Sequence, residues 1–203
     1  MRIVGITGGI GTGKSFILRQ VAQLGFPTYS ADQRAKELME QDPALRQGIL
    51  ALFGEEAYTP SGELRRPYIA EKIFQAPELR QKLNQLVHPR TIADFMDWIQ
   101  ARRAEGHPAV FKEAALTLEA GGRKGLDALL LVYAPLKVRI ERLRQRDKLT
   151  EMEILQRMNA QWPEWKKIAY ADFLIINDGH LPLRPQLQRF FEAWNIPFPA
   201  TFA

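Results

Sequence analysis

Gly8-Gly9-Ile10-Gly11-Thr12-Gly13-Lys14-Ser15 is the stretch of sequence that decides the fold. It matches the phosphate-binding P-loop, in which four variable residues separate a glycine from Gly-Lys followed by serine or threonine. Residues 3–7 before it are apolar and predict a buried strand. Residues 16–24 after it predict a helix, because apolar side chains recur there at helical spacing. A strand, a glycine-rich turn and a helix in this order are the context that a P-loop needs.

The P-loop predicts a particular set of contacts with a nucleotide. Its glycines let the backbone turn N–H groups toward a phosphate, and the helix N-terminus adds partial positive charge. The Lys14 ammonium can reach the β- and γ-phosphates, and the Ser15 hydroxyl can ligate Mg²⁺ as cofactor. A glycine-rich turn that binds nothing is the alternative. We predict that the nucleotide contacts Gly9, Ile10, Gly11, Thr12, Gly13, Lys14, Ser15 and Phe16.

Composition narrows the classes of protein that fit. The 203 residues suit one globular unit, and the absence of cysteine excludes disulfides, thiol catalysis and cysteine-zinc sites. No segment approaches the ~18 continuous apolar residues of a membrane span. The chain starts directly with a strand, so we expect no signal peptide, no membrane partner and a cytoplasmic protein. The net charge of +5 suits an enzyme that handles polyphosphates, and without a nucleic-acid-binding motif we expect no nucleic acid partner.

Short apolar segments alternate with helical patterns along the chain. Five of them predict strands, at residues 3–7, 28–30, 109–112, 128–133 and 173–176. This alternation is typical of an α/β fold, a three-layer sandwich in which helices cover both faces of a five-stranded parallel sheet. Ligands of such sheets bind at the edge formed by the carboxyl ends of the strands.

Two stretches are too long to be simple connections between strands. Residues 33–104 predict an inserted helical subdomain, with helices at 34–41, 43–53, 66–74, 77–86 and 89–104. Residues 139–170 are charged, rich in arginine and predict a helical lid. The core then comprises about 1–32, 105–138 and 171–203, and its last helix, 183–194, carries a packing pattern. We treat the whole chain, 1–203, as a single unit of these three parts.

Three carboxylates follow or lie near predicted strand ends. Asp32 comes after the second strand, where it could accept a proton from a hydroxyl group or simply cap the next helix. Glu113 follows the third strand and Glu119 lies six residues on. Either could hold Mg²⁺ through water, or be a solvated surface carboxylate.

Other polar residues are candidates for binding. Arg139, Arg142, Arg144 and Arg146 crowd one segment, and arginine forks match the equatorial oxygens of a transferring phosphoryl group. A solvated charged helix is the alternative. Asn177 follows the fifth strand, where it could read an adenine edge or form a turn. His88 precedes Pro89 at a predicted helix boundary, and alone it indicates little.

Several motifs together resemble one family, the dephospho-coenzyme A kinases, over nearly the whole chain. The resemblance rests on residues 5–15, in which Thr-Gly-Gly-Ile-Gly is more specific than a bare P-loop. It continues through Ser30-Ala31-Asp32, Leu86-Val87-His88-Pro89 and residues 113–119, and ends with residues 142–147, Gln161 and 171–177. Two positions depart from the family pattern. Ser30 stands where the family often has an aspartate, and Ala115 stands where it has a proline.

The resemblance implies an enzyme, a P-loop kinase with a helical coenzyme A-binding insert and a mobile lid. ATP would phosphorylate the ribose 3′-hydroxyl of dephospho-coenzyme A, the last step of coenzyme A synthesis. Asp32 becomes the candidate base and Lys14 the phosphate clamp. Among the four clustered arginines, our own choice for the catalytic one is Arg142. Asn177 joins the ATP site, and Asp32 and His88 the substrate site. The sequence leaves the oligomeric state open, with a monomer as the expectation.

Three other classes of function compete with this reading. A nucleoside or nucleoside-monophosphate kinase shares the core and lid, but the large helical insert favours a bulkier substrate. A regulatory GTP-binding switch would carry Asn-Lys-x-Asp and Asp-x-x-Gly, and neither string occurs. A nucleic-acid-binding module is favoured by the basic charge alone.

Overall fold

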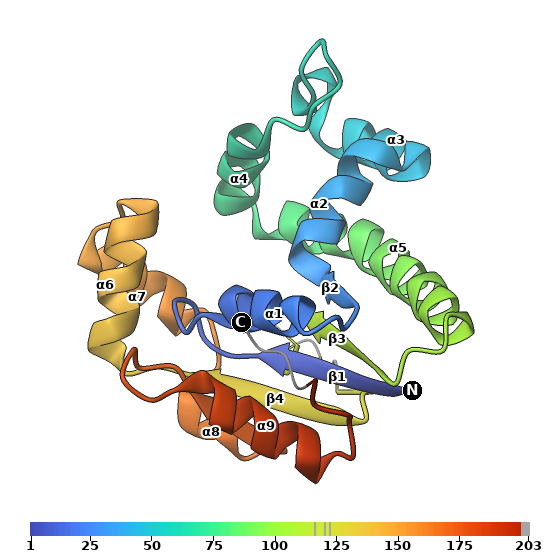
Figure 1. The fold of residues 1–203 in the computed structure, drawn as a ribbon. Coiled ribbons are helices and arrows are strands. Elements are labelled where there is room, and N and C mark those ends of the chain that lie inside the picture. Colours follow the sequence, from blue (N-terminus) through green and yellow to red (C-terminus); the bar gives the residue numbers. More distant parts are fainter. Residues whose placement is uncertain (116, 120, 122, 200–203) are drawn as a thin grey trace. The chain divides into compact units, whose positions relative to one another are not determined.

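The chain forms two compact units in the computed structural model, which describes residues 1–115, 117–119, 121 and 123–199 (Figure 1). The first unit comprises Met1–Ser30 with Arg102–Ala203, and the second comprises Ala31–Ala101. Leu116 of the segment 113–119 and the last four residues of the predicted core lie outside the described residues. In the described part of the chain, no helix has the length and apolar character needed to cross a membrane.

A parallel five-stranded sheet organises the first unit, in the order β2-β3-β1-β4-β5. All five predicted strands form, within one residue of their predicted ends, which confirms the α/β P-loop fold class. The pairing is parallel throughout, so the carboxyl ends of the strands share one edge. The strands are β1 (Arg2–Thr7), β2 (Thr28–Ser30), β3 (Ala109–Glu113), β4 (Ala128–Tyr133) and β5 (Phe173–Ile176).

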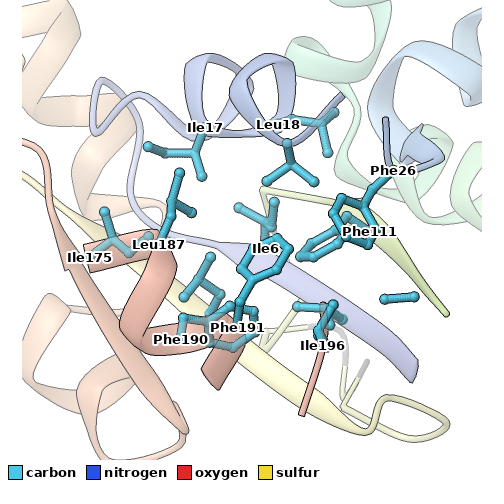
Figure 2. Packing of buried hydrophobic residues seen from close by; sticks show 14 of the residues in the cluster. Ile6, Ile17, Leu18, Phe26, Phe111, Ile175, Leu187, Phe190, Phe191 and Ile196 are labelled. Carbon is cyan, nitrogen blue, oxygen red and sulfur yellow. The ribbon is translucent and has the colours of Figure 1, made fainter. Parts of the chain in front are cut away.

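Helices α1 (Lys14–Gln23) and α9 (Leu183–Ala193) pack against one face of this sheet. Figure 2 shows their side chains meeting those of the strands in a single apolar cluster. Phe111 of β3 and Phe191 of α9 stack with ring centroids 5.6 Å apart, and both are fully buried. The predicted packing role of the last helix is therefore confirmed. Leu126 lies against the other face, at Gly5, and the short helix α8 (Glu164–Ile168) lies beside β4.

The arginine-rich stretch forms two helices before α8. They are α6 (Leu136–Asp147) and α7 (Glu151–Asn159), and Lys148 ends α6 with a left-handed φ of 54°. The Thr150 side chain then begins α7, forming a capping box with Glu153. These helices belong to the first compact unit, and their movement as a lid stays a prediction.

The second unit is helical and has its own apolar core. Its helices are α2 (Ala31–Gln41), α3 (Pro43–Phe53), α4 (Arg66–Gln75) and most of α5 (Pro77–Ala104), with a 3₁₀ turn, η1 (Glu55–Ala57). Asp42 caps α3 by accepting the N–H groups of Ala44 and Leu45. Arg34 of α2 forms a bidentate ion pair with Asp94 of α5. The core gathers Ile49, Phe53, Ala57, Tyr58, Leu64, Ile69 and Leu83.

The predicted helix break at His88-Pro89 is wrong. Helix α5 runs through Pro89 without interruption over 28 residues (Figure 1). A proline inside a helix removes one backbone hydrogen bond and costs about 3 kcal/mol. Buried side chains on both sides of it, Leu83 before and Phe95 after, offset this cost by packing. Tertiary packing therefore decides the continuity of this helix.

Candidate active site

The P-loop connects β1 to α1 as the sequence predicts. Gly13 is the N-cap of α1 and has a φ of 93°, a left-handed conformation that costs glycine little. A Cβ atom at Gly13 would also collide with the side-chain amide of Asn177. The first helical residues, Lys14 and Ser15, therefore follow a turn that only glycine accommodates well. Their N–H groups stand at a helix N-terminus, where an anion is favoured.

Two side chains of the P-loop donate hydrogen bonds to the Gly9 carbonyl. The Thr12 hydroxyl donates to it at 2.9 Å, and Lys14 Nζ donates to it at 3.1 Å. Lys14 is 8% exposed, so its side chain lies folded over the loop rather than extended into solvent. Ser15 and Phe16, by contrast, are exposed at the start of α1. The Ser15 hydroxyl is thus accessible to a solvated ion.

Asn177 lies against the P-loop. Its Nδ2 donates to the Thr12 carbonyl at 2.8 Å, and its backbone N–H donates to Tyr133. Arg142 reaches the same place, with long contacts of 3.4 Å to the Thr12 carbonyl and 3.5 Å to Oδ1 of Asn177. The geometry gives Asn177 a role in holding the loop, and its reading of adenine stays a prediction.

The four clustered arginines separate into two kinds. Arg139 and Arg142 contact the P-loop, whereas Arg144 and Arg146 form exposed ion pairs with Glu151 and Asp147. Burial holds the pKa of Arg139 below its ordinary value, although the nearby Glu164 carboxylate raises it. The Arg139 guanidinium donates to the Ile10 carbonyl and pairs with Glu164. Of these four arginines, Arg142 makes the longest hydrogen-bond contacts, 3.4 and 3.5 Å, and is the best placed to turn toward a phosphate.

Glu113 is the last residue of β3, whereas the sequence predicts that it follows the strand. It pairs in register with Ile6 of β1 and with Ser30 of β2, so it stands at the sheet edge from which the P-loop departs. Its side chain is 4% exposed, and its Oε2 accepts a hydrogen bond from the Ser30 hydroxyl. Ser30, which departs from the pattern expected for the family, thus contacts this carboxylate directly.

Glu119 has a different environment. Its Oε1 accepts the Trp162 N–H at 3.0 Å and lies 3.0 Å from Nζ of the fully buried Lys167, as an ion pair rather than a well-directed hydrogen bond. Burial acts to raise the pKa of Glu119. The contacts with Trp162 and Lys167 outweigh burial and lower that pKa below its ordinary value. These contacts indicate a structural role, which favours Glu113 over Glu119 as the residue near Mg²⁺.

Asp32 and His88 belong to the second unit. Asp32 is exposed and lies in the first turn of α2, which begins at Ala31. Asp32 is therefore a residue of the helix and not its N-cap. An acidic side chain there is favoured by the helix dipole. His88 lies within α5 and lines an open pocket of about 810 Å³ together with Arg80 and Asn84. The amide side chains of Gln81 and Gln85 also line the pocket, so it could receive a ligand with hydrogen-bonding groups.

Two polar residues of the site had no role assigned from the sequence, although Gln161 is among the residues that resemble the family pattern. Gln161 accepts the Ile10 N–H at 2.8 Å, and Glu164 pairs with Arg139 beside the loop. Both lie around α8, more than a hundred residues from the P-loop in the chain. A polar residue between short helices carries no periodic signal, so only the tertiary structure could place it. In the described part of the chain, no group of three or more His, Cys, Asp or Glu side chains forms a metal cluster.

Comparison with known proteins identifies the family of this site. The family model described as dephospho-CoA kinase matches residues 2–182. The chain belongs to the dephospho-CoA kinase family. A dephospho-CoA kinase of Chlorobium chlorochromatii is 40% identical over 181 residues, covering 87% of this chain and 85% of that protein. Members of this family are kinases, and the enzyme class expected from the sequence is confirmed.

Two solved structures extend the similarity to the fold. A Thermus thermophilus protein, TT1252, has a TM-score of 0.84 at 33% identity and covers 97% of this chain and 98% of its own. The dephospho-CoA kinase of Campylobacter jejuni has a TM-score of 0.68 at 26% identity, with 96% of each chain covered. The similarity to the dephospho-CoA kinase family therefore includes the insert and the arginine-rich helices as well as the P-loop core.

Proposed function

We propose that the chain transfers the γ-phosphoryl group of ATP to the ribose 3′-hydroxyl of dephospho-coenzyme A, the final step of coenzyme A synthesis. The observation that carries this proposal is a complete P-loop within a family match that spans residues 2–182. A nucleoside or nucleoside-monophosphate kinase is not favoured, because the match includes the helical insert as well as the core.

The proposed reaction balances as a single displacement. The 3′-oxygen of the acceptor forms a bond to the γ-phosphorus, while the bond from that phosphorus to the β,γ-bridging oxygen breaks and ADP leaves. Asp32 takes the hydroxyl proton as general base. Lys14 and Arg142 offset the negative charge that spreads over the transferring oxygens. The P-loop N–H groups orient the remaining phosphates, with Asn177 holding the loop through the Thr12 carbonyl.

The residues present fit Mg²⁺ as cofactor. Mg²⁺ prefers oxygen ligands and usually keeps several waters beside one or two protein groups and the substrate phosphates. The exposed Ser15 hydroxyl would bind it directly, and the Glu113 carboxylate would hold its water shell. When bound, the ion neutralises charge on the β- and γ-phosphates.

The second unit would supply the binding surface for the acceptor. His88 and the polar groups of its pocket are the candidates, with Arg80 offering a cation for an anionic part of the substrate. A monomer and a cytoplasmic location stay predictions of the sequence, and no nucleic acid or membrane partner is proposed.

One experiment tests the proposed function. The purified protein is incubated with Mg²⁺, ATP and, in separate reactions, dephospho-coenzyme A or a panel of nucleosides and nucleoside monophosphates. Products are identified by mass spectrometry, and the position of the new phosphate by NMR. We expect coenzyme A as the dominant product. Phosphorylation of a nucleoside panel member in its place would contradict the proposal.

A further inference from the structure

The peptide groups flanking Ile10 in the P-loop are held from outside the loop by two side chains. The Ile10 N–H donates to Oε1 of Gln161 at 2.8 Å, and the Ile10 carbonyl accepts from Nε of Arg139 at 2.8 Å. Gln161 lies just before α8 and Arg139 lies in α6. Two segments far away in sequence therefore fix the same point of the loop.

The arginine is itself held in place. NH1 of Arg139 forms an ion pair of 2.9 Å with Oε1 of Glu164, and the arginine is 7% exposed. A Cβ atom at Gly9 would collide with both side chains of this pair, so the pair packs directly on the loop backbone. Residue 9 is thus restricted to glycine by the packing of this ion pair as well as by phosphate binding.

Together with the hydrogen bond from Asn177 to the Thr12 carbonyl, these contacts limit the movement of a glycine-rich segment. A loop with several glycines samples many backbone conformations, and fixing one of them on binding costs about 1–2 kcal/mol for each residue ordered. The hydrogen bonds with Gln161 and Arg139 already order the loop at Ile10 before any nucleotide binds, so less entropy is lost on binding. A loop that is already ordered binds its ligand more tightly.

We propose that Gln161 is a positioning residue, which holds the P-loop in its phosphate-binding conformation by accepting the Ile10 N–H. Arg139, supported by Glu164, is its counterpart on the Ile10 carbonyl. We call these three side chains the Ile10 clamp. Arg139 acts through the loop and does not contact the transferring phosphoryl group. This inference rests on the proposed function, since it assumes that the loop binds the phosphates of ATP.

The test replaces Gln161 by methionine, which has a similar size but no strong acceptor. The Kd for ATP is measured by calorimetry, and exchange of the Ile10 amide is followed by NMR without nucleotide. We expect faster Ile10 exchange and an ATP Kd raised about tenfold, the equivalent of one lost hydrogen bond. Gln156→Met, an exposed position of α7, is the matched control and leaves both unchanged.

Two outcomes would overturn the clamp alone. They are a wild-type-like ATP Kd in Gln161→Met, or unchanged Ile10 exchange in that variant. Failure of the wild-type protein to bind ATP would overturn the proposed function and the clamp together. If Gln161→Met does not fold, Glu164→Gln is used in its place. This variant weakens the ion pair that holds Arg139 against the Ile10 carbonyl, and the same two quantities are measured. A normal ATP Kd in that variant would then overturn the proposal.

Discussion

The hydroxyl of Ser30 donates a hydrogen bond of 3.1 Å to Oε2 of Glu113, across the paired ends of β2 and β3. A carboxylate at a buried strand end needs such partners, because removing a charge from water without compensation is costly. The contact fixes the direction of the Glu113 side chain at the sheet edge from which the P-loop leaves.

We therefore expect Glu113→Gln to raise the Mg²⁺ concentration needed for half-maximal activity by about 10–100-fold. The amide keeps the size and can still accept from Ser30, but it lacks the charge that holds a metal-bound water. Initial rates measured over a series of Mg²⁺ concentrations at fixed ATP check this. A larger Mg²⁺ requirement in Glu119→Gln, with Glu113→Gln unaffected, would move the assignment to Glu119.

Replacing Lys14 by methionine should lower kcat about a hundredfold or more, because the ammonium offsets charge in the transition state. Methionine fills much of the same buried space, so circular dichroism and thermal unfolding should stay close to those of the wild-type protein. Lys137→Met, on the exposed surface of α6, is the control and keeps full activity. Normal turnover in a folded Lys14→Met protein would remove Lys14 from the site.

The substitution Asp32→Asn should lower kcat by about 10²–10⁴-fold with little change in the KM for ATP. The amide preserves the size of the side chain at the start of α2 but cannot accept the hydroxyl proton. Steady-state kinetics with both substrates varied provides the measurement. Asp97→Asn, at an exposed position of α5, should behave as wild type. A kcat within about twofold of wild type would show that Asp32 is not the base.

The arginines offer a matched pair of variants. Arg142→Met should depress kcat/KM strongly, because Arg142 lies beside the P-loop, with little change in thermal stability. Arg144→Met removes an exposed ion pair with Glu151 and should change neither quantity much, since such pairs contribute about 0–1 kcal/mol. Equal kinetic losses in both variants would argue that the helix acts through its overall charge.

The Glu119 carboxylate should make stability depend on pH in a defined direction. Its pKa is lowered in the folded protein, so it stabilises the fold above its unfolded pKa, and that contribution is lost as the pH falls through the folded pKa. Urea unfolding of wild type and Glu119→Gln should differ most near neutral pH. The difference should shrink as the pH falls below about 4.5, the ordinary value for a glutamate. A constant difference across pH would exclude this carboxylate as the source.

The parts of the fold that were predictable have strong local signals. Strands buried on both faces are nearly continuous runs of apolar residues, as β4 is, and the P-loop has a fixed pattern of glycine and lysine. The continuity of α5 was not predictable, because Pro89 is a local signal for an end and the packing that overrides it is remote. A local sequence pattern shows only what a segment prefers by itself. Where that preference conflicts with tertiary packing, as at Pro89, the contacts with remote residues decide the structure.

The site was predictable in its motif residues and not in its contacts. Lys14 and Ser15 follow from the pattern, but the choice between Glu113 and Glu119 needed the pairing of β3 and the contacts of Trp162 and Lys167. The clustered arginines looked equivalent in sequence. Their partners in the fold separate Arg139 and Arg142 from the two surface arginines.

The strand order has a consequence for how the chain is made. β1 precedes both of its partners in the chain, since β3 and β4 begin at Ala109 and Ala128. Contacts between residues so distant in the chain form slowly. During synthesis the apolar β1 therefore has no strand partner until the helical segment 31–101 and then β3 have been made. The nascent chain would be most exposed to aggregation in this interval, and a chaperone that shields short apolar strands would act on it then.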